Sequence, residues 1–257
     1  MSDNDIIGHI VLGQGPQKVI ILHGWWSDHT AYDSIIPFLD TNRFTYAFPD
    51  YRGYGKSLNM AGEHTIEQIA KDCIALADHL DWNMFHLVGH SMGGMAVQKV
   101  IQMVPNRVSS AVAITPVPAC GSPLEGDRKP LFHRAAEQDE NRIQILNYLT
   151  SSRLSESWYK YIVRRSRETT KKQAFHDYML AWTETNFSDK VQGLKTPILV
   201  LVGEYDQGIT AEAMSQTILE WFPKATIDVI QNSGHFPMLE TPARLATVME
   251  NYLVKHG

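Results

Sequence analysis

The feature that most constrains the fold is a serine between glycines, where one apolar run ends and another begins. Residues 85–88 read Phe-His-Leu-Val, as in a buried strand, and residues 89–93 read Gly-His-Ser-Met-Gly. The chain from there to about Val104 is apolar on nearly all sides and predicts a buried helix. So tight a strand–turn–helix tolerates only glycine at the flanking positions and strains the serine. We therefore expect the Ser91 hydroxyl to meet solvent and substrate as a nucleophile.

Short apolar runs and amphipathic stretches alternate along the rest of the chain, which is typical of an α/β fold. The runs are rich in β-branched residues, as in strands buried on both faces of a mostly parallel, twisted sheet. An early pair of runs flanks the turn 13–16 and predicts a hairpin. The expected strands are residues 6–11, 18–22, 44–48, 85–88, 110–114, 198–202 and 226–230.

Helices are expected between these strands, with apolar residues repeating every three or four positions. They cover about residues 66–80, 91–104 and 211–222, and a last helix opens with Thr241 as N-cap and Pro242 as first residue.

Residues 116–191 break the alternation, because they contain no strand-like run. Their pattern predicts helices at 142–149, 157–165 and 170–187, in a segment too small for an independent domain. We expect a core domain made of residues 1–115 and 192–257, with residues 116–191 inserted as a helical lid.

Composition narrows the function classes. The 257 residues carry 23 Lys+Arg against 28 Asp+Glu, so the net charge of −5 argues against nucleic-acid binding. No leader is visible in residues 1–10, and no apolar stretch approaches the roughly 18 residues of a membrane span. Cys73 and Cys120 have neither disulfide-framework nor metal-ligand spacing, and no cofactor motif is present. A cytoplasmic monomer or homodimer without metal or cofactor is expected.

A serine nucleophile needs a base, and the base needs an acid to orient it. His235 lies in a loop between the last strand and the last helix, at the carboxyl end of the sheet, where sites of open α/β sheets are found. Asp206 follows strand 198–202 by a short turn, while Glu204 and Asp228 are rivals for its role. We expect Ser91, Asp206 and His235 to be the catalytic residues.

The oxyanion of an acyl-transfer intermediate needs two donors. The backbone N–H of Met92 is one candidate, and that of Trp25 is the other, because Gly24 allows the backbone to turn there. The doublet Trp25-Trp26 is either part of the core or the wall of a pocket.

These motifs together resemble the α/β-hydrolase superfamily, in its lid-bearing branch of serine carboxylesterases and lipase-like enzymes. Ser91 stands where dehalogenases and epoxide hydrolases have aspartate, and His90 stands where hydrolases of carbon–carbon bonds often have asparagine. The matching segments are residues 23–25, 50–57, 89–93, 203–206 and 234–237, with Glu240 and Pro242.

The resemblance implies hydrolysis of a small carboxylic ester or lactone through an acyl-enzyme. We expect an uncharged substrate, because the loops around Ser91, Trp25 and His235 hold no arginine or lysine. Expected substrate contacts are Trp26, His90, Trp158, Trp182 and Phe236.

Several alternatives stay open on the same fold. They are an acyl-homoserine-lactone lactonase, a thioesterase, a carbon–carbon hydrolase, a cofactor-free oxygenase or perhydrolase, and a ligand receptor or regulator that hydrolyses slowly.

Overall fold

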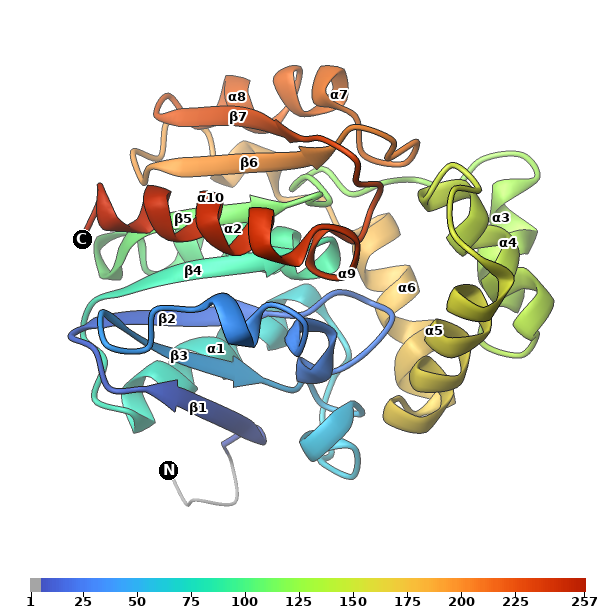
Figure 1. Ribbon diagram of the computed structural model, residues 1–257, viewed down its shortest axis with the longest axis horizontal. Coiled ribbons are helices and arrows are strands. Elements are labelled where there is room, and N and C mark those ends of the chain that lie inside the picture. Colours follow the sequence, from blue (N-terminus) through green and yellow to red (C-terminus); the bar gives the residue numbers. More distant parts are fainter. Residues whose placement is uncertain (1–5) are drawn as a thin grey trace.

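A twisted seven-stranded sheet forms the centre of the computed structural model, which describes residues 6–257 (Figure 1). The strand order is β1-β3-β2-β4-β5-β6-β7, and all neighbours are parallel except β1 and β3. Part of the segment inspected for a leader, residues 1–5, lies outside the described residues. The strands are β1 (His9–Gly13), β2 (Gln17–Leu22), β3 (Phe44–Pro49), β4 (Phe85–His90), β5 (Val108–Ile114), β6 (Ile198–Gly203) and β7 (Ala225–Ile230).

The predicted hairpin between the first two strands is wrong. β1 pairs antiparallel with β3, with His9 opposite Pro49, while β2 lies between β3 and β4. The last four residues of β2 are buried, which requires neighbours on both sides, whereas β1 is half-exposed and suits an edge. The turn after β1 is also bound to the start of β3, since the Gly15 N–H donates to Phe44 O at 3.1 Å.

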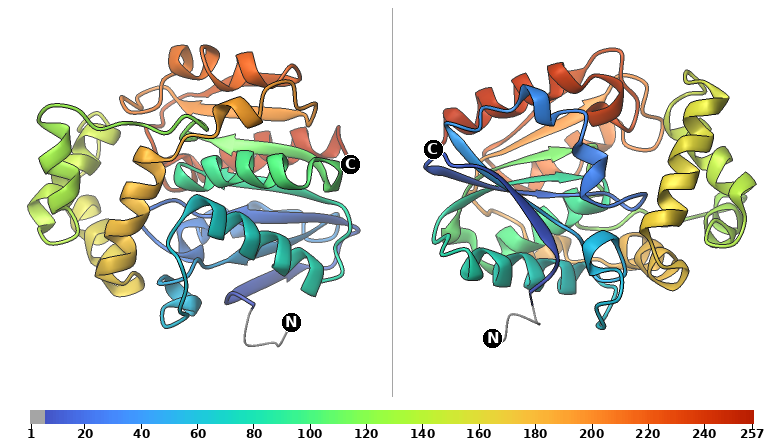
Figure 2. Two further views of the ribbon diagram at one scale, coloured as in Figure 1. Left: turned by 180° about the vertical axis from the view of Figure 1, so that it is seen from behind. Right: turned by 60° about the horizontal axis from the view of Figure 1, so that its bottom comes forward.

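Helices cover both faces of the sheet, with α1 and α2 on one face and α10 on the other (Figures 1 and 2). Thr65 caps α1 by accepting a hydrogen bond from Gln68 N at 3.1 Å. The core helices are α1 (Ile66–His79), α2 (Met92–Met103), α7 (Ala211–Ser215), α8 (Ile218–Trp221), α9 (Pro237–Glu240) and α10 (Pro242–Val254). Short 3₁₀ helices are η2 (His29–Tyr32), η3 (Ile36–Phe38), η4 (Gly55–Ser57), η5 (Pro105–Arg107) and η6 (Ser188–Lys190).

Two helix predictions need correction. The single helix predicted over 211–222 is two short ones, because Thr217 between them leaves helical geometry at φ −130° and ψ −91°. The Thr241 hydroxyl does not cap α10, since it donates backwards to Pro237 O at 3.4 Å in the preceding turn. No helix within residues 6–257 has the length and apolarity needed to cross a membrane.

Four helices join β5 to β6 and lie beyond the carboxyl ends of the parallel strands (Figure 1). Three of them correspond to predicted helices, and α3 was not predicted because its seven residues include Pro130 and are mostly charged or polar. They are α3 (Arg128–Arg134), α4 (Asp139–Leu149), α5 (Glu156–Thr169) and α6 (Lys172–Glu184). The division of the chain into core and lid remains a prediction.

Candidate active site

Ser91 occupies a strained turn between β4 and α2. Its φ of +55° and ψ of −116° are rarely adopted by residues with a side chain, and such strain is concentrated at functional sites. A Cβ at Gly89 would lie 2.3 Å from Gly93 O, and a Cβ at Gly93 would lie 2.6 Å from Leu22 O. Both glycines are therefore required for the turn, as the motif predicts.

His235 and Asp206 meet at the carboxyl edge of the sheet. The His235 Nδ1–H donates to Asp206 Oδ2 at 2.6 Å, and both residues are buried. The other carboxylate oxygen, Oδ1, accepts from Gly208 N at 2.8 Å and from Ile209 N at 3.1 Å. The carboxylate is thus fully engaged in orienting the imidazole, and the Nε2 atom is left to accept a proton.

The two rival acids lie away from the imidazole. Glu204 is exposed and accepts from Asn232 N at 2.8 Å, while the exposed Asp228 accepts from its neighbour Val229 N. Of the three carboxylates considered from the sequence, only Asp206 contacts His235.

Ser91 and His235 line one cavity, which has a volume of about 40 Å³. Ser91 is only 8% exposed, contrary to the expectation that its hydroxyl meets solvent, because Phe132 of α3 and Trp182 of α6 line the same space. The Ser91 hydroxyl forms no hydrogen bond within residues 6–257. A volume of this size holds a few water molecules, so a substrate must displace some of the lining side chains.

The loop that carries His235 is held by hydrogen bonds to Glu240 and to α4. Glu240 accepts from Gly234 N at 2.8 Å and from Phe236 N at 3.0 Å, and it also pairs with Arg153 at 3.0 Å. The backbone N–H of His235 donates to Leu149 O of α4 at 3.1 Å. The position of the imidazole therefore depends on α4 as well as on the core.

Two side chains donate hydrogen bonds to the backbone carbonyl of His235. His90 Nε2 donates to it at 2.8 Å, and Thr115 Oγ1 donates at 3.1 Å. Burial, together with the nearby His235, lowers the pKa of His90 well below its usual value, so His90 is a neutral donor. Thr115 also has a strained φ of +39°. The sequence motifs gave no sign of the Thr115 contact, and they predicted His90 as a substrate contact rather than a support.

The loop after β2 holds the predicted oxyanion residue Trp25 against α6. The Trp25 indole N–H donates to Phe175 O at 2.6 Å, and the two rings stack with centroids 4.1 Å apart. Trp25 O accepts from Tyr54 OH at 2.9 Å. A Cβ at Gly24 would lie 2.5 Å from His90 Nδ1, which explains the glycine. Met92, the other predicted donor, is buried at the first position of α2.

The predicted substrate contacts divide between two cavities. Trp26 and Trp182 line the cavity of Ser91, whereas His90 and Phe236 line a second one, which Trp26 also borders. Trp158 belongs to neither lining and instead packs edge-on against Phe236 at 5.6 Å. Trp26 is therefore a shared wall between two spaces.

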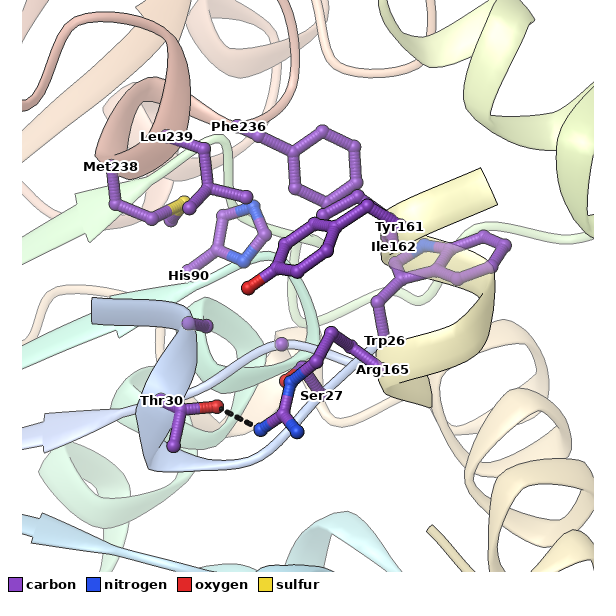
Figure 3. Close-up of a pocket in the computed structure, with 12 residues that line it drawn as sticks. Trp26, Ser27, Thr30, His90, Tyr161, Ile162, Arg165, Phe236, Met238 and Leu239 are labelled. Carbon is purple, nitrogen blue, oxygen red and sulfur yellow. Dashed lines mark hydrogen bonds between the residues drawn. The ribbon is translucent and has the colours of Figure 1, made fainter. Parts of the chain in front are cut away.

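Four separate segments surround the second cavity, which Figure 3 shows: the loop after β2, the end of β4, α5 and the start of α9. Arg165 of α5 lines it and is engaged, donating to Thr30 Oγ1 at 2.9 Å and pairing with Glu168 at 3.2 Å (Figure 3).

The cavity of Ser91 also contains a charge that the sequence did not predict. Arg128, at the start of α3, lines it together with Ser122 and several apolar side chains. The expectation of an uncharged substrate considered the catalytic loops alone, and the undetected helix α3 brings an arginine to them.

One group of side chains within residues 6–257 has the composition of a metal site, namely Asp28, His29 and Asp50. Asp50 accepts from His29 N, His29 Nδ1 and Lys56 N at 2.7 to 2.8 Å, and the carboxylate raises the pKa of His29. Asp28 Oδ1 accepts from Thr30 Oγ1 at 2.5 Å, so both carboxylates have protein partners, and the group stabilises the loop after β2.

Known proteins share the fold of this chain. The model of a family described as "alpha/beta hydrolase fold" matches residues 18–242. A non-heme haloperoxidase of Rhodococcus erythropolis is 26% identical over 256 residues, covering 91% of this chain and 90% of that protein. A bifunctional esterase/perhydrolase of Acinetobacter calcoaceticus is 26% identical over 221 residues, covering 77% of this chain and 78% of that protein.

Among solved structures, a hydrolase from Oleispira antarctica superposes with a TM-score of 0.85 at 20% identity, covering 99% of this chain and 97% of the other. The family match spans most of the chain, from β2 to the start of α10. The protein belongs to the α/β-hydrolase fold family.

Proposed function

We propose that the protein is a serine hydrolase that cleaves carboxylic esters or lactones through an acyl-enzyme. The observation that carries the proposal is the 2.6 Å bond from His235 to Asp206, beside the cavity that His235 shares with the strained Ser91. A nucleophile, an orienting acid and a base, in this order along the chain, are the combination that acyl transfer on this fold requires.

In this mechanism the Ser91 oxygen attacks the substrate carbonyl while His235 Nε2 takes its proton. The tetrahedral oxyanion accepts hydrogen bonds from the backbone N–H groups of Trp25 and Met92. His235 then gives the proton to the leaving alkoxide, and Asp206 stabilises the imidazolium that forms in between. In the second half, water attacks the acyl-enzyme with His235 again as base, which releases the acid and restores Ser91.

Perhydrolysis is the second candidate, favoured by the named activity of the Acinetobacter relative. It would use the same acyl-enzyme, with hydrogen peroxide in place of water as the attacking group. Peracid formation when peroxide is added to an ester assay distinguishes it from plain hydrolysis.

The proposal is tested by labelling with a fluorophosphonate, which reacts with activated serines. We expect one adduct per chain, located at Ser91 by peptide mapping and absent in Ser91→Ala. Ser122→Ala is the matched control, because Ser122 lines the same cavity without a strained backbone, and this variant should label fully. An adduct on any other serine, or none on the folded protein, contradicts the proposal.

A further inference from the structure

Two buried donors at the cavity of Ser91 have no acceptor in the part of the chain that the structure describes. Arg128 Nε and Trp182 Nε1 lack hydrogen-bond partners within residues 6–257, and both residues line this cavity. The remaining unpartnered buried side-chain atoms of the described chain are oxygens of Gln17 and Gln102, which do not line it. Buried polar groups are nearly always paired, so two unpaired donors beside one reactive site indicate an acceptor supplied by a ligand.

The charge of Arg128 is also uncompensated. No carboxylate of residues 6–257 forms an ion pair with it, and its guanidinium lies 5.7 Å from the Phe132 ring centroid and 5.8 Å from that of Tyr148. No aspartate or glutamate of residues 6–257 lines the cavity. Arg165 at the second cavity differs, because Glu168 and Thr30 already occupy its guanidinium.

We propose that the substrate carries a free carboxylate, which accepts hydrogen bonds from Arg128 and Trp182 while Ser91 attacks the ester carbonyl. This inference rests on the proposed function and replaces the uncharged substrate expected from the sequence. A planar guanidinium and an indole N–H that line the same cavity offer several donors to the two oxygens of a carboxylate. Arg128 is half-buried rather than fully buried, so the pair keeps part of its hydration and the desolvation cost is limited.

The cavity must widen before a substrate can enter it. Its present volume of about 40 Å³ is too small for an ester, so substrate entry must move side chains that line it. Arg128 stands at the first position of α3, a helix of only seven residues, where a long side chain adjusts without disturbing the sheet. Movement of this kind exposes the two donors to the ligand.

The test compares matched pairs of methyl esters. One member of each pair is the monomethyl ester of succinic, glutaric or adipic acid, and the other has an isopropyl group in place of the free carboxylate. We expect wild-type kcat/KM to favour the half-ester at one or more lengths by about tenfold or more, since hydrogen bonds to charged groups are the strong ones.

The variants assign that preference to the two donors. Arg128→Met should lower kcat/KM for the half-ester by about 10- to 100-fold and leave the isopropyl ester within about twofold. Arg128→Lys should recover part of the loss, and Trp182→Phe should lower half-ester activity several-fold through KM. Lys129→Met, an exposed change of equal charge in the same helix, is the control that should alter neither substrate.

A separate binding measurement keeps the inference independent of turnover. Glutarate should raise the melting temperature of the wild type and of the Lys129→Met control, but not that of Arg128→Met. Equal loss on both esters in Arg128→Met, or a wild-type preference for the isopropyl ester, overturns the carboxylate site while leaving the hydrolase intact. Absence of Ser91 labelling and of hydrolysis overturns the proposed function instead, and glutarate binding then decides the site by itself.

Discussion

Asp206 and Glu204 leave the same strand two residues apart, and at the scale of single residues their hydrogen bonds distinguish them. Asp206 is buried and contacts the imidazole at 2.6 Å, while Glu204 is exposed and holds a turn through Asn232 N. Asp206→Asn should keep the packing but favour the wrong imidazole tautomer, which lowers kcat by about 10³- to 10⁴-fold in serine proteases.

Steady-state kinetics on a p-nitrophenyl ester measure this effect, with Glu204→Gln as the matched control. The control should stay within a few-fold of the wild type. A large loss of kcat in Glu204→Gln together with a mild loss in Asp206→Asn would show that Glu204, and not Asp206, is the orienting acid.

Sequence analysis missed Thr115 and Arg128 for the same physical reason. The candidate catalytic side chains lie in motifs or directly after strands, so their positions along the sequence are enough to predict them. Thr115 acts through a single bond to the His235 carbonyl across 120 positions, and Arg128 reaches the cavity from a short helix without amphipathic periodicity. Contacts of this kind depend on tertiary packing, which no local pattern reports.

At the scale of elements, the loop after β2 separates the two cavities through Trp26. Trp26→Ala should join them into one space and move the preferred acyl chain to a longer length. Each additional buried methylene contributes about 0.8 kcal/mol, so kcat/KM should rise severalfold per carbon until the new wall is reached. A series of p-nitrophenyl esters from acetate to decanoate measures the position of that maximum.

Val117→Ala is the control for the Trp26 change, because Val117 lines the Ser91 cavity without bordering the other. It enlarges one space and should shift the maximum by no more than one carbon. Truncation of a buried tryptophan costs about 3–5 kcal/mol of stability, so Trp26→Phe provides a milder variant with the same direction. An unchanged profile in both Trp26 variants would show that the second cavity plays no part in substrate binding.

The strands also show which structural features the sequence pattern did not predict. Six strands were predicted to within two residues at each end because each contains an apolar run, whereas the first, expected at residues 6–11, lies at His9–Gly13. The pairing of the first two strands was not predicted, since β1 and β2 are neighbours in sequence and not in the sheet. Exposure distinguishes edge strands from central strands. The edges β1 and β7 are half-exposed, and the strands between them are almost wholly buried. An apolar run in the sequence therefore predicts the burial of a strand more reliably than it predicts the neighbouring strand in the sheet.

At the scale of the whole molecule, burial of neutral histidines links stability to pH. Burial lowers the pKa of His86 from its ordinary 6.5 to about 4, and it also lowers the pKa values of His23 and His90. Below pH 6.5 these three histidines therefore bind more protons in the unfolded chain than in the folded one, and their contribution lowers the free energy of unfolding as the pH is lowered towards 4. Above pH 6.5 these groups are neutral in both states and contribute no slope.

His86 supplies a testable share of this acid sensitivity. A His86 pKa of 6.5 in the unfolded chain and of about 4 in the folded one corresponds to about 3 kcal/mol of stability lost between pH 6.5 and pH 4, of which about 2 kcal/mol is lost by pH 5. His86→Gln should remove that part of the slope, because the amide keeps a polar partner for Ser110, which contacts His86 Nδ1 at 2.9 Å, and does not titrate. Urea unfolding at pH 7.5, 6.0 and 5.0 gives the three free energies for each variant. His79→Gln, at an exposed position, should retain the wild-type slope, and an equal slope in His86→Gln would mean that His86 is protonated without cost in the folded protein.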